Sequence, residues 1–208
     1  MSKPSAYIAQ HGFPKDQRAT VAALFWQAFK AKLGLLMRPE ETALQFLTQV
    51  ADPLHALCVL HDEGTLLGVA GFKTDTGSFV GGGLSDLAQA YGWLGALWRA
   101  VGLSLLERDL QPGVLTMDGI FVAPHARGLG IGTTLLQAIK TEAAAQGCHA
   151  VRLDVIDINP RARALYEREG FVAQKTKQIG PLRHLFGFQT ATEMRFALSP
   201  VADTARPQ

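Results

Sequence analysis

The first half of the chain shows two kinds of hydrophobic periodicity. Along two segments, apolar residues recur three and four positions apart, which is the spacing of an amphipathic helix. Two short, mostly apolar runs flank Asp62-Glu63-Gly64, an arrangement that is typical of a β-hairpin. In chain order, the predicted elements are a short strand over 5–10, a helix over 17–33, a helix that begins at Pro39, and paired strands over 56–61 and 65–72.

A strongly apolar segment follows Gly81-Gly82-Gly83 and predicts a helical insertion over about 84–109. The spacing predicts one packing stripe, formed by Leu84, Leu87, Tyr91, Leu94, Trp98, Val101 and Leu105. Trp93, Leu97 and Leu103 lie off that stripe, so a second surface must cover the helix. We expect no membrane span, because the longest uncharged run, 87–98, is shorter than the roughly 20 residues that cross a bilayer.

The second half alternates between strand and helix patterns. Asn159-Pro160 supplies an N-cap followed by proline at the first helical position, and Gly170 supplies a helix end. The predicted elements are strands over 114–122, 150–156, 171–178 and 190–198, a helix over 130–146, and a short helix over 160–169. This alternation predicts an α/β sheet with a parallel crossover in its middle. The end of the chain, 199–208, is predicted to be a flexible tail.

Composition limits the kind of protein that these elements can form. The chain has 208 residues, of which 48% are hydrophobic and 18% are charged, and its formal net charge is +2. These values predict a single domain over 1–198 with an insertion at 79–112. The near-neutral charge, without a run of like charges, argues against nucleic acid as a partner.

Cysteine, histidine and the start of the chain add three expectations. Cys58 and Cys148 lie in apolar stretches without a second ligand at metal-binding spacing, and the six histidines show no such spacing either. We therefore expect two small buried hydrophobes, with no disulfide framework and no metal. The first residues contain no apolar core of a secretory signal, which predicts a cytoplasmic protein.

A glycine-rich turn follows the predicted strand over 114–122. Gly128, Gly130 and Gly132 open the next helix, where glycines let backbone N–H groups approach a phosphate or pyrophosphate. A P-loop is excluded because no Gly-Lys-Ser/Thr follows. The spacing also argues against a dinucleotide fingerprint, since residues 123–127 separate the strand from the first glycine. Glycines that merely fit a tight turn remain an alternative for this segment taken alone.

A second motif accompanies the glycines. Residues 159–171 read Asn-x-x-Ala-x-x-x-Tyr-x-x-x-Gly-Phe and follow Arg-x-x-Gly-x-Gly at 127–132 in the expected order. Together the two motifs resemble the GCN5-related N-acetyltransferase superfamily, over residues 114–198 by motif and over the first half by topology only. The resemblance implies an α/β fold with a mixed, mostly antiparallel sheet, a central splayed parallel strand pair and flanking helices.

The resemblance also implies where acetyl-CoA binds as co-substrate. Backbone N–H groups over 128–133 would bind its pyrophosphate, and the strand over 120–122 would pair with its pantetheine. The cofactor residues implied in this way are Ile120, Phe121, Val122, Arg127, Gly128, Leu129, Gly130, Ile131, Gly132, Thr133 and Asn159.

The chemistry of acetyl transfer points to three catalytic candidates. A tyrosine has an ordinary pKa of about 10, so Tyr166 can protonate a thiolate whose conjugate acid has a pKa near 8.5. The Val122 N–H is the candidate oxyanion donor. An amine with a pKa of about 10.4 must lose a proton first, to Asp118, to Asp154 or through a water chain. Tyr166 as a core residue and both aspartates as solvated strand ends are the structural alternatives.

The predicted function is therefore transfer of an acetyl group from acetyl-CoA to a primary amine by direct transfer. The alternative is a non-catalytic acyl-CoA-binding or protein-interaction module of the same fold. A small-molecule or peptide amine is the expected acceptor, and its identity stays open. The apolar insertion suggests either an apolar acceptor pocket or a homodimer contact.

Overall fold

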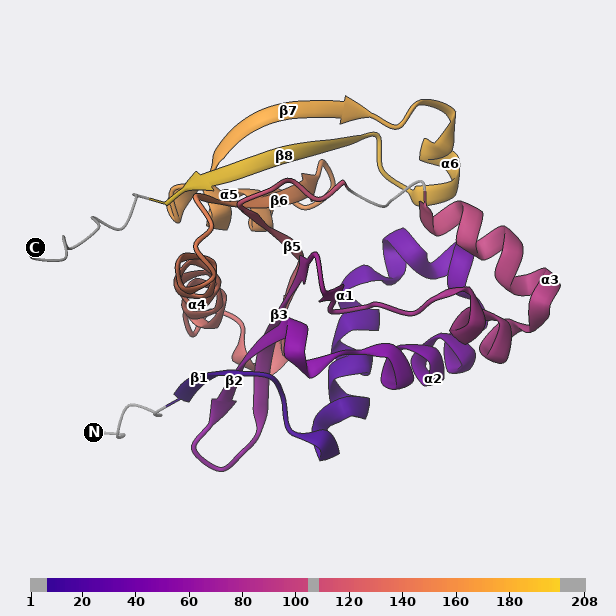
Figure 1. The fold of residues 1–208 in the computed structure, drawn as a ribbon, viewed down its shortest axis with the longest axis horizontal. Helices are drawn as coiled ribbons and strands as arrows, with labels where there is room; N and C mark the ends of the chain where they lie inside the picture. The colour runs from indigo at the N-terminus through magenta and orange to yellow at the C-terminus, as the bar shows by residue number, and fades with distance from the viewer. Residues whose placement is uncertain (1–6, 105–108, 199–208) are drawn as a thin grey trace, which may run out of the picture.

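The structure is a computed structural model that describes residues 7–104 and 109–198. One sheet forms its centre, with the strand order β1-β2-β3-β5-β6-β8-β7 and the short β4 paired to β3 (Figure 1). The strands are β1 (Tyr7–His11), β2 (Ala56–His61), β3 (Leu66–Thr74), β4 (Gly77–Ser78), β5 (Val114–Val122), β6 (Ala150–Ile156), β7 (Val172–Gln178) and β8 (Thr190–Ala197). All neighbouring pairs are antiparallel except β5 and β6.

The parallel strands β5 and β6 separate along their length. Their pairing is confined to residues 114–116 opposite 150–152, while β5 stays paired with β3 and β6 with β8. A register shift beside Gly71 makes Asp118 the extra residue of a β-bulge in β5, and a bulge bends its strand. The predicted α/β fold, mostly antiparallel around a splayed parallel pair, is confirmed.

Helices cover both faces of this sheet (Figure 1). They are α1 (Arg18–Met37), α2 (Glu40–Val50), α3 (Leu84–Ser104), α4 (Ile131–Ala145), α5 (Pro160–Arg168) and α6 (Arg183–Phe186). α4 and α5 pack on one face and bury residues such as Leu135 and Ile139. α1, α2, α3 and α6 lie on the other face, so the gap between β5 and β6 has helices on both sides.

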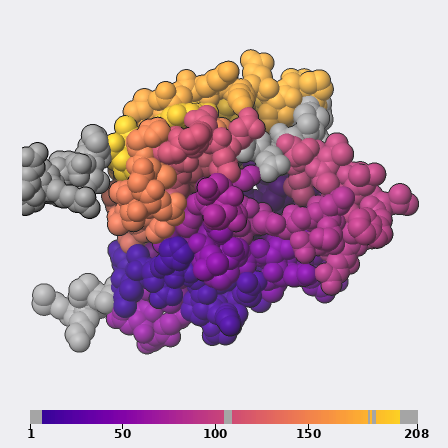
Figure 2. Space-filling view, viewed as in Figure 1, coloured from indigo at the N-terminus to yellow at the C-terminus, as the bar shows by residue number. Residues whose placement is uncertain are grey.

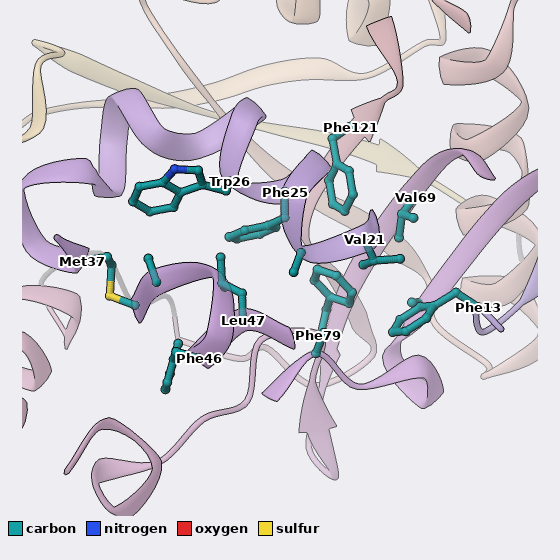
Figure 3. Packing of buried hydrophobic residues seen from close by; sticks show 14 of the residues in the cluster. Phe13, Val21, Phe25, Trp26, Met37, Phe46, Leu47, Val69, Phe79 and Phe121 are labelled. Atoms are coloured by element: carbon teal, nitrogen blue, oxygen red, sulfur yellow. The ribbon is translucent and has the colours of Figure 1, made fainter. Parts of the chain in front are cut away.

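An aromatic cluster fastens α1 to the sheet. Phe25 of α1 packs against Phe79 and Phe121, with ring centroids 5.8 Å away in both cases (Figure 3). The absence of a side chain at Gly71 of β3 leaves the space that the Phe79 ring occupies, because a Cβ on Gly71 would lie 2.6 Å from Phe79 Cγ. This packing holds α1 against the side of the sheet where the two central strands separate.

Most elements begin and end close to their predicted limits. α1 is the main exception, since it continues beyond Leu33 to Met37. Leu36 and Met37 are 2% and 3% exposed, so tertiary packing outweighs the low helix propensity of Gly34. β4 and α6 were not predicted, because elements of two and four residues are too short to show a period.

The predicted single packing stripe of the insertion helix is wrong. Gly92 has φ 69° and ψ 163°, so α3 consists of two helical pieces with independent phases. In the second piece Ala96 and Gly102 face inward, while Leu94 is 87% exposed. Small residues face inward because α1 lies close to this piece of α3. A Cβ on Gly102 would lie 2.6 Å from Leu36 Cδ2 of α1.

Some sequence predictions lie partly or wholly outside the described residues. The flexible tail over 199–208 is one, and the start of the first strand at 5–6 is another. The end of the insertion helix, at 105–108, is also outside. The domain limits at 198, 79 and 112 stay predictions.

Candidate active site

A cavity of about 670 Å³ opens where β5 and β6 separate. Its lining comes from α1, β5, β6, β7, β8, α5 and α6, so segments from distant parts of the chain meet there. Five of the predicted site residues line it, namely Asp118, Ile120, Asp154, Asn159 and Tyr166. The structure therefore brings the candidate acid and both candidate bases to one cavity.

The turn from β5 into α4 presents unused backbone donors. Among the described residues, no acceptor binds the N–H groups of Gly128, Gly130, Ile131, Gly132 and Thr133. The first N–H of the helix with a partner is that of Thr134, which donates to the Gly130 carbonyl at 3.0 Å. No side chain of the described ranges caps this end of the helix. Free N–H groups at a helix start are an anion-binding arrangement.

Glycine is required in this turn by its backbone conformation. Gly128 and Gly130 have φ values of +86° and +81°, which residues with a Cβ rarely adopt. A Cβ on Gly128 would meet no atom within 4 Å, so the space above the turn is open. Arg127 and Leu129 flank it as exposed residues. The free donors, the open space and the adjacent guanidinium fit a pyrophosphate.

The edge of β5 that faces away from β3 also carries backbone N–H groups without an acceptor among the described residues. Ala123 donates its N–H to the Leu67 carbonyl at 2.8 Å. Because antiparallel pairing alternates, the N–H groups of Ile120 and Val122 point to the opposite edge, from which β6 has separated. Phe121 differs, since its ring is buried in the aromatic cluster and its backbone faces β3. Its predicted role in cofactor binding stays a prediction.

α5 positions Tyr166 and Asn159. The predicted N-cap is confirmed, because Asn159 Oδ1 accepts the Ala162 N–H at 3.2 Å and Pro160 occupies the first helical position. Two turns later the Tyr166 side chain, 7% exposed, lines the cavity and packs against Phe171 at 6.0 Å between ring centroids. Tyr166 is thus buried in the core and reaches the cavity as well.

The two candidate bases stand on either side of the gap between β5 and β6. Asp118 Oδ2 accepts the N–H of Phe79 at 3.2 Å. Asp154 Oδ1 lies 3.9 Å from Nε of Arg152. Both side chains line the cavity, and each remains a candidate for taking the proton of the amine.

Around Asp154 lies a group of charged side chains that the sequence alone did not identify. We call Arg152, Asp154, Glu193 and Arg195 the charged grid. The register sets Arg152 opposite Arg195 and Asp154 opposite Glu193. Arg152 Nη2 lies 3.2 Å from Glu193 Oε2, and Arg195 Nε donates to Glu193 Oε1 at 2.7 Å. Glu193 is thus bound by two guanidinium groups. This attraction offsets the repulsion between the two arginines and between the two carboxylates that the register sets opposite each other.

β7 adds two lysines to the lining of the cavity. Lys175 is paired with Glu193 and so lies in line with the grid, while Lys177 is paired with Ala191, one line further along the strands. The sequence does contain a signal, because charges occupy every second position at 152/154, 175/177 and 193/195 and therefore share one strand face. That these three strands are neighbours, in the order β6-β8-β7, follows only from the topology.

The described residues form neither a metal site nor a membrane-spanning helix. Within 7–104 and 109–198, no group of three or more His, Cys, Asp or Glu side chains is arranged to hold a metal ion. The helices of the same ranges include none with the length and apolar character of a membrane span. Cys58 and Cys148 are free thiols, buried and half-buried respectively.

Known proteins share short, similar segments with this chain. Over 58 residues it is 38% identical to the uncharacterised N-acetyltransferase YhfO of Bacillus subtilis, which is 28% of this chain and 39% of that protein. Over 54 residues it is 39% identical to the thialysine N-epsilon-acetyltransferase of Bos taurus, which is 26% of this chain and 32% of that protein. The matched segments thus span less than half of these relatives.

The fold is shared over a much longer stretch. The crystal structure of an N-acetyltransferase from Staphylococcus aureus Mu50 superposes with a TM-score of 0.65 at 16% identity, covering 91% of this chain and 100% of that one. The profile of the acetyltransferase (GNAT) family matches residues 19–171, well over half of the sequence. This chain therefore belongs to the acetyltransferase (GNAT) family.

Proposed function

We propose that this protein transfers an acetyl group from acetyl-CoA to a primary amine by direct transfer. One observation carries the proposal: the free donors at the start of α4 continue into the free edge of β5, which leads to the cavity that holds Tyr166. The name of the bovine relative, a thialysine N-epsilon-acetyltransferase, describes acetyl transfer to an amine and supports the same class of reaction.

The start of α4 would hold the pyrophosphate of acetyl-CoA. Its five free N–H groups can bind phosphate oxygens without giving up a partner, and Arg127 adds a charged donor beside them. The N–H groups of Ile120 and Val122 would pair with carbonyl oxygens of pantetheine and of its acetyl thioester, as the backbone of an added strand would. When bound, acetyl-CoA supplies the activated acetyl thioester. Asn159 borders the same cavity.

Residues of the cavity would move the protons. Asp118 or Asp154 accepts one proton from the ammonium form of the amine, directly or through water. The nitrogen then bonds to the acetyl carbon, the carbon–sulfur bond breaks, and the Tyr166 hydroxyl donates its proton to the departing sulfur. Tyr166 regains a proton from the nitrogen through water, and the Val122 N–H stabilises charge on the acetyl oxygen. The products are an amide, the CoA thiol and one released proton.

A panel of primary amines with acetyl-CoA tests the proposal by the rate of thiol release. We expect amine-dependent release from the intact chain and stabilisation against heating by acetyl-CoA, because a ligand that binds only the folded state raises its stability. Stabilisation without release under any amine would support the alternative, a non-catalytic acyl-CoA-binding or interaction module. Stabilisation by NAD and not by acetyl-CoA would contradict both.

We also propose that a second copy of this chain covers the α3 face, by which we mean the exposed side chains Trp93, Leu94, Leu97, Trp98 and Val101. α3 forms one end of the molecule in the space-filling view (Figure 2). A fully exposed aromatic side chain offers roughly 150–250 Å², so the two tryptophans, 71% and 48% exposed, supply roughly 180–300 Å², and the three aliphatic side chains extend this area. A standard interface buries about 800 Å² per partner.

A cytoplasmic location stays a prediction.

A further inference from the structure

The two arginines of the charged grid are already occupied by the protein. Beside its contact with Glu193, Arg152 donates from Nη1 to the Asp109 carbonyl at 3.3 Å. Arg195 donates from Nη2 to Gln111 Oε1 at 2.6 Å. The Arg152 side chain is only 6% exposed, and among the described residues its Nε has no hydrogen-bond acceptor. Both guanidinium groups are thus bound mainly to groups of the protein itself.

The lysines of β7 are in a different situation. Lys175 and Lys177 are exposed and line the same cavity. In the described part of the chain, neither ammonium group makes an ion pair or a hydrogen bond, because Glu193 is already bound by the two arginines. One side of the cavity therefore carries two ammonium groups that no carboxylate of the described residues pairs with.

An apolar stretch separates Lys177 from β6, whereas Glu193 lies between Lys175 and Asp154 on the neighbouring line of the sheet. Neighbouring strands lie about 4.8 Å apart, so the backbones of β6 and β7 are roughly 10 Å apart, with β8 between them. On the line of Lys177, Ile156 of β6 is paired with Ala191 of β8, and Ala191 with Lys177 of β7. Buried Phe186 and Phe188 line the cavity nearby. The small side chain of Ala191 leaves room for a hydrocarbon chain.

From this order of charges we infer that the acceptor is an ω-amino carboxylate, in which an aliphatic chain separates a primary amine from a carboxylate. The inference rests on the proposed function, since the amine must reach the space between Asp118, Asp154 and Tyr166. The chain would then cross Ala191, and the carboxylate would meet Lys175 and Lys177. The carboxylate takes no part in the bond changes, which remain those of acetyl transfer to the nitrogen.

Two probe amines isolate the contribution of the carboxylate. 6-Aminohexanoate and hexylamine share a six-carbon chain and a primary amine, and they differ in the terminal carboxylate. The measurement is the ratio of kcat/KM for 6-aminohexanoate to kcat/KM for hexylamine, in which a general change in activity cancels. We expect a ratio of about ten or more, because a charge-assisted contact contributes roughly one factor of ten in affinity. Added salt should lower the ratio.

Variants of β7 assign this ratio to the lysines. In the double variant Lys175→Gln/Lys177→Gln we expect the ratio to fall about tenfold, to near one. Lys175→Arg/Lys177→Arg keeps both charges and should keep most of the preference. Lys15→Gln is the matched control, since it removes an exposed lysine that does not line the cavity and should leave the ratio unchanged.

The outcomes separate this inference from the function on which it rests. A ratio near one in the unaltered protein, with hexylamine acetylated, overturns the inference and leaves the proposed function standing. A preference that survives the double glutamine variant also overturns it. If neither probe is acetylated while another amine of the panel is, the inference alone is overturned. If acetyl-CoA binds and no amine of the panel is acetylated, the proposed function fails, and the inference fails with it.

Discussion

Glu193 and Arg152 form a largely buried ion pair across β8 and β6, with Glu193 Oε2 3.2 Å from Arg152 Nη2. Their side chains are 14% and 6% exposed. Each strand also supplies a second charge at the alternate position, so the pair lies inside a network. Because the network borders the cavity, the packing that stabilises this part of the sheet also shapes the proposed acceptor site.

Glu193→Gln should destabilise the fold by about 3 kcal/mol, because it leaves buried guanidinium charge without its carboxylate. Denaturant unfolding measures the change. Glu167→Gln is the control: it removes the carboxylate from the Arg163–Glu167 pair, whose side chains are 49% and 51% exposed, and should cost less than about 0.5 kcal/mol. Equal losses in the two variants would contradict a special contribution of the buried network.

Tyr166→Phe should reduce acetyl transfer by roughly 10²–10⁴-fold, because the change removes the proton donor for the departing sulfur. The aromatic ring and its packing on Phe171 are retained, so the affinity for acetyl-CoA should stay close to that of the unaltered protein. Steady-state kinetics and a direct binding titration provide the two readouts. Unchanged turnover would remove Tyr166 from the proposed role.

Gly128→Ala should weaken acetyl-CoA binding by about tenfold, since a Cβ disfavours the positive φ that aims the free N–H groups. Gly64→Ala is a matched control in the β2–β3 turn: its φ is +81°, and its Cβ would also meet nothing within 4 Å. Both changes should cost about 1 kcal/mol of stability. The expectation is wrong if calorimetric titration gives the two variants the same affinity.

The thiol of Cys58 should make stability depend on alkaline pH. Burial raises its pKa from an ordinary 9.0 to about 11, and a hydrogen bond with Gln10 opposes this only in part. Between pH 9 and 11 the unfolded chain loses the proton while the folded chain keeps it, so rising pH favours unfolding by up to about 1.4 kcal/mol per pH unit.

A comparison with Cys58→Ala isolates this contribution. We expect the difference in unfolding free energy between the unaltered protein and the variant to be constant below pH 8. Above pH 9 the difference should shift in favour of the variant. Denaturant unfolding at a series of pH values measures it, and a difference that stays flat up to pH 11 would contradict the raised pKa.

Leu94→Gln combined with Leu97→Gln should dissociate the proposed dimer. Both side chains belong to the α3 face and are 87% and 59% exposed in one copy of the chain. Removing two buried leucines from each copy should raise the dissociation constant by roughly 100-fold or more. Light scattering over a range of concentrations gives the mass, and a monomeric unaltered protein would rule out this use of the face.

Much of the fold was predictable because its signals are local. Asn159 and Pro160 define the start of α5 through a side chain and a fixed φ, and neither needs a distant partner. Gly128 and Gly130 likewise indicate a turn whose positive φ values only glycine adopts without strain. β5 and β6 begin and end at the predicted residues, since each carries a run of apolar residues of ordinary strand length.

α3 shows where local patterns fail. Its apolar residues are regularly spaced, and yet Leu94 and Val101 are exposed while Ala96 and Gly102 face inward. Spacing alone cannot reveal that Gly92 leaves the helical conformation and resets the phase. Nor can it reveal that α1 approaches so closely that only small residues fit between the helices.

The sequence by itself determined the family motifs, the order of the main elements and the candidates Tyr166, Asp118 and Asp154, because these depend on residue type and short-range spacing. Only the tertiary structure decided that β8 lies between β6 and β7, which sets Glu193 beside Asp154 and Lys175 beside Glu193. The physical reason is that strand pairing joins residues far apart in the chain. Which charges become neighbours, and which stay uncompensated, is therefore a property of the sheet and not of any single strand.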